Sequence, residues 1–472
     1  MSTQGSSWSD LLSGKNAARS IALSGGVTLH AINIYIATTI LPSVVKEIGG
    51  LDLYAWNTTL FVVASILGSA LTAKILQRTG PRVSYAIASL FFLAGSLICA
   101  LAPSMPVMLV GRAVQGLGGG LMFALCYSMI QLVFEERLWP RAMALVSGMW
   151  GIATLIGPAI GGIFAEMDAW RLAFGSLVPV TLAYILLTSN VLPKRDMNQP
   201  PVGRLPLLQL FLLAAAVLSV CIGSASSLPT WNLLGIGLCL LLVFFLVRHE
   251  SSTLTRLLPK DALRLNTPLF ALYATMGLLV VGMTSEIFVP YFLQTLHGQT
   301  PLISGYLAAL MAAGWTLSEV MSSGWRERGV RRAIISGPVF VLVGLIILAV
   351  AIPFDSGGDW ALLTPICIAL TLVGFGIGIG WPHLLTRVLQ VASAEDQDSA
   401  ASSITTVQLF ATALGAALAG MIANMAGLND PTNMEGTANA ARWLFALFTI
   451  APILALVTAV RSARIRPGLA AV

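Results

Sequence analysis

Four ionisable side chains stand out within long apolar segments of the chain: His30, Arg112, Glu286 and Glu319. An ionisable group inside a membrane is costly unless it meets water, a polar partner or an opposite charge. A carboxylate shielded from water favours its protonated form, and an imidazole titrates near neutral pH, so either group can gain and lose a proton. A guanidinium stays charged and can serve as their fixed partner. These four residues are candidates for a proton-coupling site.

Arg112 and Glu286 form the pair that we expect to couple proton movement to another event. Glu286 lies four residues before Pro290, about one turn from an expected kink. Each residue has a plainer alternative. Arg112 could have a structural role, by hydrogen-bonding backbone carbonyls or by reaching the nearby outer membrane–water interface. Glu286 could be exposed to water at the outer end of its span.

Glu319 and His30 are the second pair of candidates. Glu319 lies nearer the cytoplasmic end of its segment, where it could also reach water or pair with Arg326 or Arg328. His30 lies one helical turn before Asn33 on the same face, and its alternative is an ordinary buried polar contact.

Polar and aromatic residues in the middle of the segments are candidates to line a cavity for a flat, apolar ligand. Their alternative is packing against lipid or neighbouring helices. Trp150 is the leading one, because it lies two turns before Gly157. The candidates are Asn33, Tyr35, Gln115, Tyr127, Trp150, Tyr291, Trp315 and Trp381.

Long apolar helices must position these side chains. The 472 residues are 57% hydrophobic and only 10% charged, with a mean hydropathy of +0.86. Because about 20 apolar residues span the hydrocarbon core, the sequence predicts an all-α polytopic membrane protein with fourteen spans. Little length remains for a soluble catalytic or nucleotide-binding domain. The predicted spans are 20–43, 57–76, 83–102, 106–133, 141–165, 171–192, 205–225, 231–247, 269–296, 302–323, 333–353, 361–385, 399–426 and 440–460.

The positive charge predicts the topology of these spans. Of 26 Lys and Arg residues, 22 lie on the cytoplasmic side, Lys46, Arg171 and Arg442 lie on the outer side, and Arg112 lies deep within a span. Cytoplasmic loops retain cations during insertion, so both termini are expected in the cytoplasm of a plasma-membrane (bacterial inner-membrane) protein. Insertion also explains the net charge of +6, so no nucleic-acid partner is expected.

The longest cytoplasmic connections divide the chain into two six-helix bundles and a two-helix insert. The loop after the second span resembles the loop after the tenth, with Gly80 and Arg82 matching Gly329 and Arg331. Six-span internal repeats are a mark of secondary transporters. The expected parts are a cytoplasmic tail 1–19, a bundle 20–192, linkers with the insert 193–268, a bundle 269–460 and a tail 461–472.

The five cysteines lie singly in apolar segments, at Cys99, Cys126, Cys221, Cys239 and Cys367. No CxxC or other ligand spacing occurs, so the sequence predicts neither disulfides nor a metal site. We expect no cofactor, and a proton gradient as the energy source.

Three motifs resemble the major facilitator superfamily, specifically its fourteen-span drug:proton antiporter group. The first lies in the short loop after the second span, where Arg78, Gly80 and Arg82 match the family pattern. Ala73 replaces its leading Gly, and Gln77 replaces an Asp that in the family latches one conformation.

The second motif runs from Gly111 to Gly120 and contains the family signature Arg-x-x-Gln-Gly, with Arg112 at the position associated with proton coupling. The third is the antiporter signature in the fifth span, with Ala153 in place of one Gly. Its matching residues are Gly157, Pro158, Gly161 and Gly162. The first span departs from the family, because Asn33 stands where an Asp is common.

The resemblance implies proton-coupled export of amphipathic small molecules, as in multidrug efflux, by alternating access of a central cavity. The partners would be a small-molecule substrate, protons and the lipid bilayer, and we expect a monomer. One alternative is an exporter of a specific endogenous metabolite such as a siderophore or lipid. A more remote one is a membrane receptor or enzyme that transports nothing.

Overall fold

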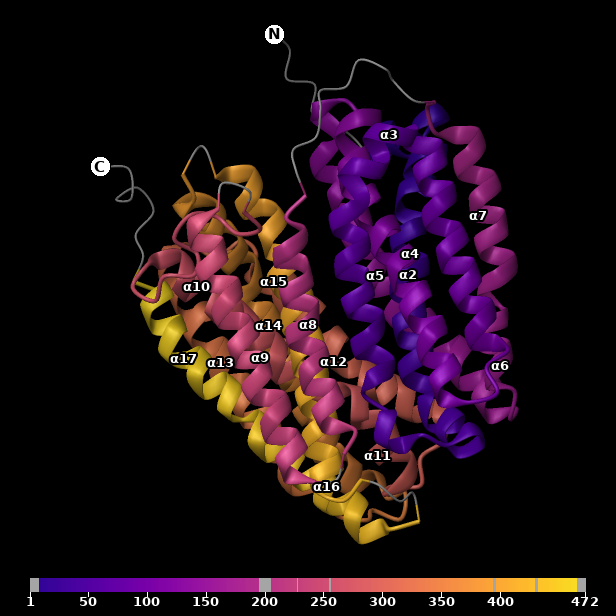
Figure 1. Ribbon diagram of the computed structural model, residues 1–472, viewed down its shortest axis with the longest axis vertical. Helices are drawn as coiled ribbons and strands as arrows, with labels where there is room; N and C mark the ends of the chain where they lie inside the picture. The colour runs from indigo at the N-terminus through magenta and orange to yellow at the C-terminus, as the bar shows by residue number, and fades with distance from the viewer. Residues whose placement is uncertain are drawn as a thin grey trace. The chain divides into compact units, whose positions relative to one another are not determined.

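The computed structural model describes residues 8–194, 205–226, 228–253, 256–393, 396–428 and 432–464, and these residues form helices and connecting turns with no strand (Figure 1). Within these ranges thirteen helices are long and apolar enough to cross a membrane. The chain divides into unit 1 (Met1–Val44 and Leu60–Leu205) and unit 2 (Val45–Thr59 and Pro206–Val472). Most of the predicted linker 193–204 and the ends of both predicted tails lie outside the described residues.

Unit 1 carries the helices of the first half of the chain. The first predicted span begins earlier and ends later than expected, because helix α2 covers Gly14–Ile48. The elements are α1 (Trp8–Leu11), α2, α3 (Trp56–Ala100), α4 (Met105–Val133), η2 (Glu136–Leu138), α5 (Trp139–Glu166), α6 (Trp170–Gly175) and α7 (Leu177–Val191).

Helix α3 contains two predicted spans joined by a kink at Gly80, whose φ and ψ are 77° and 171°. The two halves of α3 run past α4 in opposite directions. In the first half, residue 61 meets 116 and residue 65 meets 120, so this half runs parallel to α4. In the second half, residue 92 meets 118 and residue 95 meets 115, so this half runs antiparallel to α4. The kink therefore reverses the chain, and the halves behave as separate helices.

Gly80→Ala is expected to destabilise the protein by about 1–3 kcal/mol, because this backbone region is open almost only to glycine. Gly148→Ala in α5 is the matched control, since nothing lies within 4 Å of an added Cβ there. That control should be neutral or stabilising by about 0.5–1 kcal/mol. Thermal unfolding of the purified variants measures both, and equal losses would contradict the argument.

Unit 2 carries the predicted insert and the second half of the chain. Two predicted spans, the ninth and the fourteenth, are each divided into shorter helices. The elements are η1 (Leu51–Leu53), α8 (Leu207–Ser224), α9 (Pro229–Ser252), α10 (Pro268–Met283), η3 (Thr284–Phe288), α11 (Val289–Thr295), α12 (Pro301–Ser322), α13 (Glu327–Ala351), α14 (Trp360–Val391), α15 (Gln397–Met425), α16 (Met434–Phe448) and α17 (Ile450–Ser462).

The predicted insert is the hairpin of α8 and α9, which packs within unit 2. Helix α8 lies against α15, and α9 lies against α8 (Figure 1). Asn424 of α15 donates from Nδ2 to the carbonyl of Ser224 at the end of α8, over 3.1 Å. The insert is therefore attached through α8, while α9 leaves many large apolar side chains exposed, as a lipid-facing helix requires.

The segment Val45–Thr59, which links the first two predicted spans, packs within unit 2. The ring of Tyr54 stacks on Phe288 with centroids 4.9 Å apart. Asn424 also donates from Nδ2 to the carbonyl of Asp52, over 2.8 Å. This loop is thus held by an aromatic stack and a partly buried hydrogen bond.

His297, in the turn after α11, lies outside the membrane-crossing helices and is held on both ring nitrogens. Nδ1 lies 2.9 Å from Ser356 Oγ, and Nε2 lies 3.0 Å from the carbonyl of Ile352. Burial lowers the pKa of the imidazole, against the opposing influence of the Ile352 hydrogen bond and the charge of Asp355.

Because its folded pKa is depressed, His297 contributes full stability above its unfolded pKa of about 6.5 and loses it as the pH falls. The wild-type melting temperature should therefore drop between pH 7 and pH 5. His297→Gln should show a shallower drop over this interval, and an unchanged pH dependence in that variant would contradict the assignment.

Candidate functional site

An aromatic cluster surrounds His30 inside unit 1. Its ring stacks on Phe61 at 5.3 Å between centroids and lies 5.6 Å from Phe123. Trp150 meets it edge-on at 6.2 Å. Tyr127 extends the cluster, with its ring 5.4 Å from that of Phe123. Three of the predicted site residues, His30, Tyr127 and Trp150, are therefore brought together from α2, α4 and α5.

Arg112 joins this cluster through Phe61. Its guanidinium carbon lies 4.1 Å from the centroid of the Phe61 ring, in cation–π geometry, and the residue is only 2% exposed. Nη1 donates to Gln115 Oε1 over 2.5 Å, and Gln115 Nε2 donates to Ser96 Oγ over 2.8 Å. The predicted Arg-x-x-Gln signature is thus a buried hydrogen-bonded chain with a permanent charge at one end.

The glycines of α4 allow this close approach. A Cβ at Gly119 would lie 2.5 Å from His30 Nδ1, and one at Gly116 would lie 2.2 Å from the carbonyl oxygen of Phe61. Any side chain at these two positions would push the imidazole and Phe61 away from α4. The glycines therefore serve helix packing, and the packing brings both His30 and Arg112 against the ring of Phe61.

Asn33 is fully buried on α2, and neither atom of its side-chain amide has a hydrogen-bond partner among the described residues. Nδ1 of His30, one turn earlier, also has none. Buried polar atoms in proteins are nearly always hydrogen-bonded, so these two unsatisfied groups, one turn apart on α2, are candidates to hydrogen-bond a ligand. Asn33 and His30 are therefore the residues of the site with hydrogen-bonding capacity left to offer a ligand.

The third motif joins α5 to α2. A Cβ at Gly157 would lie 2.4 Å from that of Tyr35, and one at Gly161 would lie 3.1 Å from the carbonyl of Ile36. Helix α5 continues through Pro158, and Gly162 is buried beside it. The motif holds α5 closely against α2 beside Asn33.

In unit 2, Glu286 lies on the 3-10 segment η3, between α10 and α11. The expected break is present, but it precedes Pro290, which lies in the first turn of the next helix and does not kink a continuous one. The Glu286 side chain is half-buried, and no described residue hydrogen-bonds or ion-pairs with its carboxylate. An uncommitted carboxylate beside a helix break is chemically suited to exchange a proton.

Glu319 has a different environment. Its Oε2 accepts from the indole Nε1 of Trp315 over 3.0 Å. Trp315 in turn lies edge-on to Trp381 of α14, with centroids 5.0 Å apart. The alternative of an ion pair with Arg326 or Arg328 does not occur within 4 Å in the described part of the chain.

The remaining predicted residues have structural contacts. Tyr291 lies edge-on to Tyr54, at 5.5 Å, in the aromatic group that fixes the loop Val45–Thr59. Arg82 donates from Nε to the carbonyl of Leu192 at the end of α7, whereas Arg78 is exposed. The first motif therefore fastens the turn at Gly80 to the last helix of unit 1.

Sequence reasoning missed one ion pair, in which the arginine is buried and the acid is exposed. Arg387 is only 2% exposed within α14, since that helix extends past the predicted end of the span. Its Nη2 lies 2.6 Å from Glu327 Oε1, and Nη1 donates to the carbonyl of Ser462 over 2.5 Å. Arg112 is therefore not the only arginine buried in a membrane-length helix. An arginine two residues past the end of an apolar segment carries no sequence signal that separates it from a loop cation.

The fold and the site define a class: a multi-pass helical membrane protein with a polar and aromatic site inside its helices, as in transporters. Residues 23–416 match the model of the Major Facilitator Superfamily, and the chain belongs to that family. It is a transporter rather than an enzyme and resides in the membrane, in bacteria the inner membrane.

Similar proteins agree with this class. The chain is 36% identical over 454 residues to a probable multidrug-efflux transporter of Mycobacterium tuberculosis strain H37Rv, covering 94% of each. It is 24% identical over 396 residues to the multidrug transporter protein MdtP of Bacillus subtilis, covering 81% of this chain and 71% of that one. A bacterial homologue of the lysosomal transporter Spinster, crystallised inward-facing and unoccupied, matches with a TM-score of 0.68 at 14% identity, covering 95% of this chain and 97% of that one.

Proposed function

We propose that this transporter exports amphipathic small molecules in exchange for protons, by alternating access. The observation that carries the proposal is the buried site of unit 1, where unsatisfied amide and imidazole groups adjoin an aromatic cluster. Such a site offers flat apolar surface together with a few polar contacts, which suits ligands with a ring system and a polar group. The relative from Mycobacterium tuberculosis, named as a probable multidrug-efflux transporter, supports the same substrate class.

The proposed topology has fourteen crossings with both termini in the cytoplasm. The reversal of α3 at Gly80 supports it, since α3 then counts as two crossings and the other twelve membrane-length helices as one each. The enrichment of cations in alternate loops supports the orientation.

Glu286 is the proposed proton carrier, and Arg112 is the proposed fixed charge of the coupling pair. The uncommitted carboxylate of Glu286 supports the first role, because it can change charge without breaking an ion pair. The buried and hydrogen-bonded guanidinium of Arg112 supports the second. Protonation of Glu286 from outside would weaken substrate binding, and loss of the proton inside would restore it. His30 and Glu319 are the reserve candidates.

The test of the substrate class is transport by the purified protein in proteoliposomes, across a panel of amphipathic cations, neutral dyes and polar metabolites. We expect several chemically unrelated amphipathic compounds to be transported and to compete with one another. Transport of a single metabolite class, such as siderophores or lipids, would favour the narrower exporter. Binding without movement of any compound would overturn export.

Asn33→Leu should weaken binding of transported compounds by about tenfold, because its amide is the unsatisfied group of the site. Asn190→Leu is the matched control, since Asn190 is exposed at the end of α7. Fluorescence titration of the two variants measures the effect. Equal affinity in the Asn33 variant and the wild type would remove Asn33 from the substrate site.

A further inference from the structure

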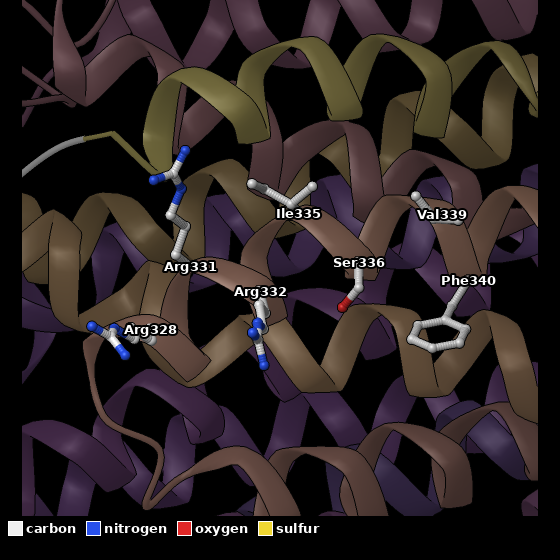
Figure 2. A pocket seen from close by; sticks show the side chains of 7 residues that line it. All are labelled: Arg328, Arg331, Arg332, Ile335, Ser336, Val339 and Phe340. Carbon is white, nitrogen blue, oxygen red and sulfur yellow. The ribbon is translucent and has the colours of Figure 1, made fainter.

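An open groove of about 680 Å³ runs along one face of the first half of α13. Figure 2 shows Arg328, Arg331 and Arg332 at one end, with Val339 and Phe340 at the other. Ile335 and Ser336 line the stretch between them. The spacing of these residues by three and four places them on one face of the helix. The groove therefore has a cationic end and an apolar end.

The charge at the cationic end is uncompensated within the described residues. Arg328, Arg331 and Arg332 are exposed, and none has a carboxylate within 4 Å. The neighbouring acid, Glu327, is engaged by the buried Arg387 at 2.6 Å. Three guanidinium groups within two helical turns consequently remain available to a negatively charged group.

The apolar end continues along the outer surface of unit 2. Val339, Ile346 and Val350 of α13 are 41%, 49% and 61% exposed. On the opposite face, Ile334 and Val341 are fully buried or nearly so. A row of exposed apolar side chains on a membrane-length helix is suited to lipid chains, so the groove leads from cations to hydrocarbon.

Phe340 and Ser336 give the groove its shape. Phe340 lies edge-on to Phe375 of α14, with ring centroids 5.3 Å apart, which fixes it as a wall. The Ser336 hydroxyl, between the arginines and the apolar residues, makes only a long 3.4 Å bond to the carbonyl of Ala333. It is placed to bond an ester or glycerol oxygen below a phosphate.

We propose that this groove binds one anionic diacyl phospholipid of the phosphatidylglycerol type. The phosphate lies among the three arginines, and one acyl chain follows Ile335 and Val339. Arginine matches phosphate oxygens in paired hydrogen bonds, and basic clusters at the end of membrane helices favour anionic headgroups. A free phosphate would leave the apolar half unused, and a choline headgroup would bring a cation to the arginines.

The test is native mass spectrometry of the full-length protein titrated with phosphatidylglycerol or phosphatidylcholine. The variant combines Arg328→Gln, Arg331→Gln and Arg332→Gln. The control combines Lys15→Gln, Arg248→Gln and Lys260→Gln, which remove the same charge from exposed positions elsewhere. The arginine variant should bind phosphatidylglycerol about 100-fold more weakly, since each cation near an anionic lipid contributes about fivefold. The control should bind like the wild type, and thermal unfolding verifies that both variants fold.

Two further experiments distinguish binding of the whole lipid from binding of its phosphate headgroup alone. A photoreactive phosphatidylglycerol labelled in the acyl chain should crosslink to a peptide containing residues 335–340. Inorganic phosphate and glycerol phosphate should not displace the lipid at concentrations at which phosphatidylglycerol does. Displacement by inorganic phosphate, equal binding of phosphatidylcholine, or equal losses in both triple variants would overturn the proposal.

Discussion

Glu286→Gln is expected to abolish uphill export while leaving substrate binding and substrate exchange across the membrane intact. Glutamine keeps the size of the side chain and resembles the protonated carboxyl, but it has no proton to release. The helix break at η3 should tolerate the change, since no described residue depends on the carboxylate for a hydrogen bond or ion pair. The measurements are accumulation driven by an imposed pH gradient, and counterflow without one.

Glu435→Gln is the matched control, because Glu435 is an exposed acid at the start of α16. It should export at the wild-type rate. If the Glu286 variant also exported at the wild-type rate under a pH gradient, Glu286 would not be the coupling residue, and His30 or Glu319 would be the next candidate. Loss of counterflow as well as uphill export would show that Glu286 is needed for binding or for the conformational change itself.

Arg112→Ala is expected to abolish transport and to destabilise unit 1 by about 3 kcal/mol. The substitution removes a cation–π contact with Phe61 and a charged hydrogen bond, and leaves the buried Gln115 Oε1 without that donor. Arg112→Lys keeps the charge but loses the planar fork, so it should recover part of the stability and little of the transport. Thermal unfolding and counterflow are measured on the same preparations.

Arg137→Gln is the control, since its ion pair with Glu135 is exposed and contributes little. It should behave as the wild type in both measurements. Full transport by Arg112→Lys would mean that a positive charge is sufficient at this position. Full transport by Arg112→Ala would show that Arg112 has no role in coupling. Its role would then be structural, which is the alternative that the sequence left open.

The helical class and much of the candidate site were accessible from the sequence, because membrane helices follow directly from hydropathy and charge. Small residues allow membrane helices to approach closely, and Gly116 in the glycine-rich stretch of α4 meets Phe61 in this way. The loop expected around Gly80 is present as a sharp kink at that residue, where the chain reverses. Pro290 indicated a helix break near Glu286, displaced by a few residues from its true place.

What the sequence did not predict depends on contacts between distant residues. Phe61 lies in the apolar run Leu60–Val63, where nothing distinguishes it from a lipid-facing side chain, yet its ring contacts both His30 and Arg112. Arg387 was assigned to a loop because hydropathy falls before the helix ends. Side-chain partners depend on the tertiary fold, which periodicity does not encode.

The central claim is that export is driven by exchange with protons. The most direct measurement is the internal pH of proteoliposomes, followed with a trapped dye while a transported compound moves outward through right-side-out protein. We predict proton entry that begins with substrate, stops with Glu286→Gln and persists with Glu435→Gln. Uphill export that continues after an ionophore has collapsed the proton gradient, with no substrate-dependent change in internal pH, would contradict it.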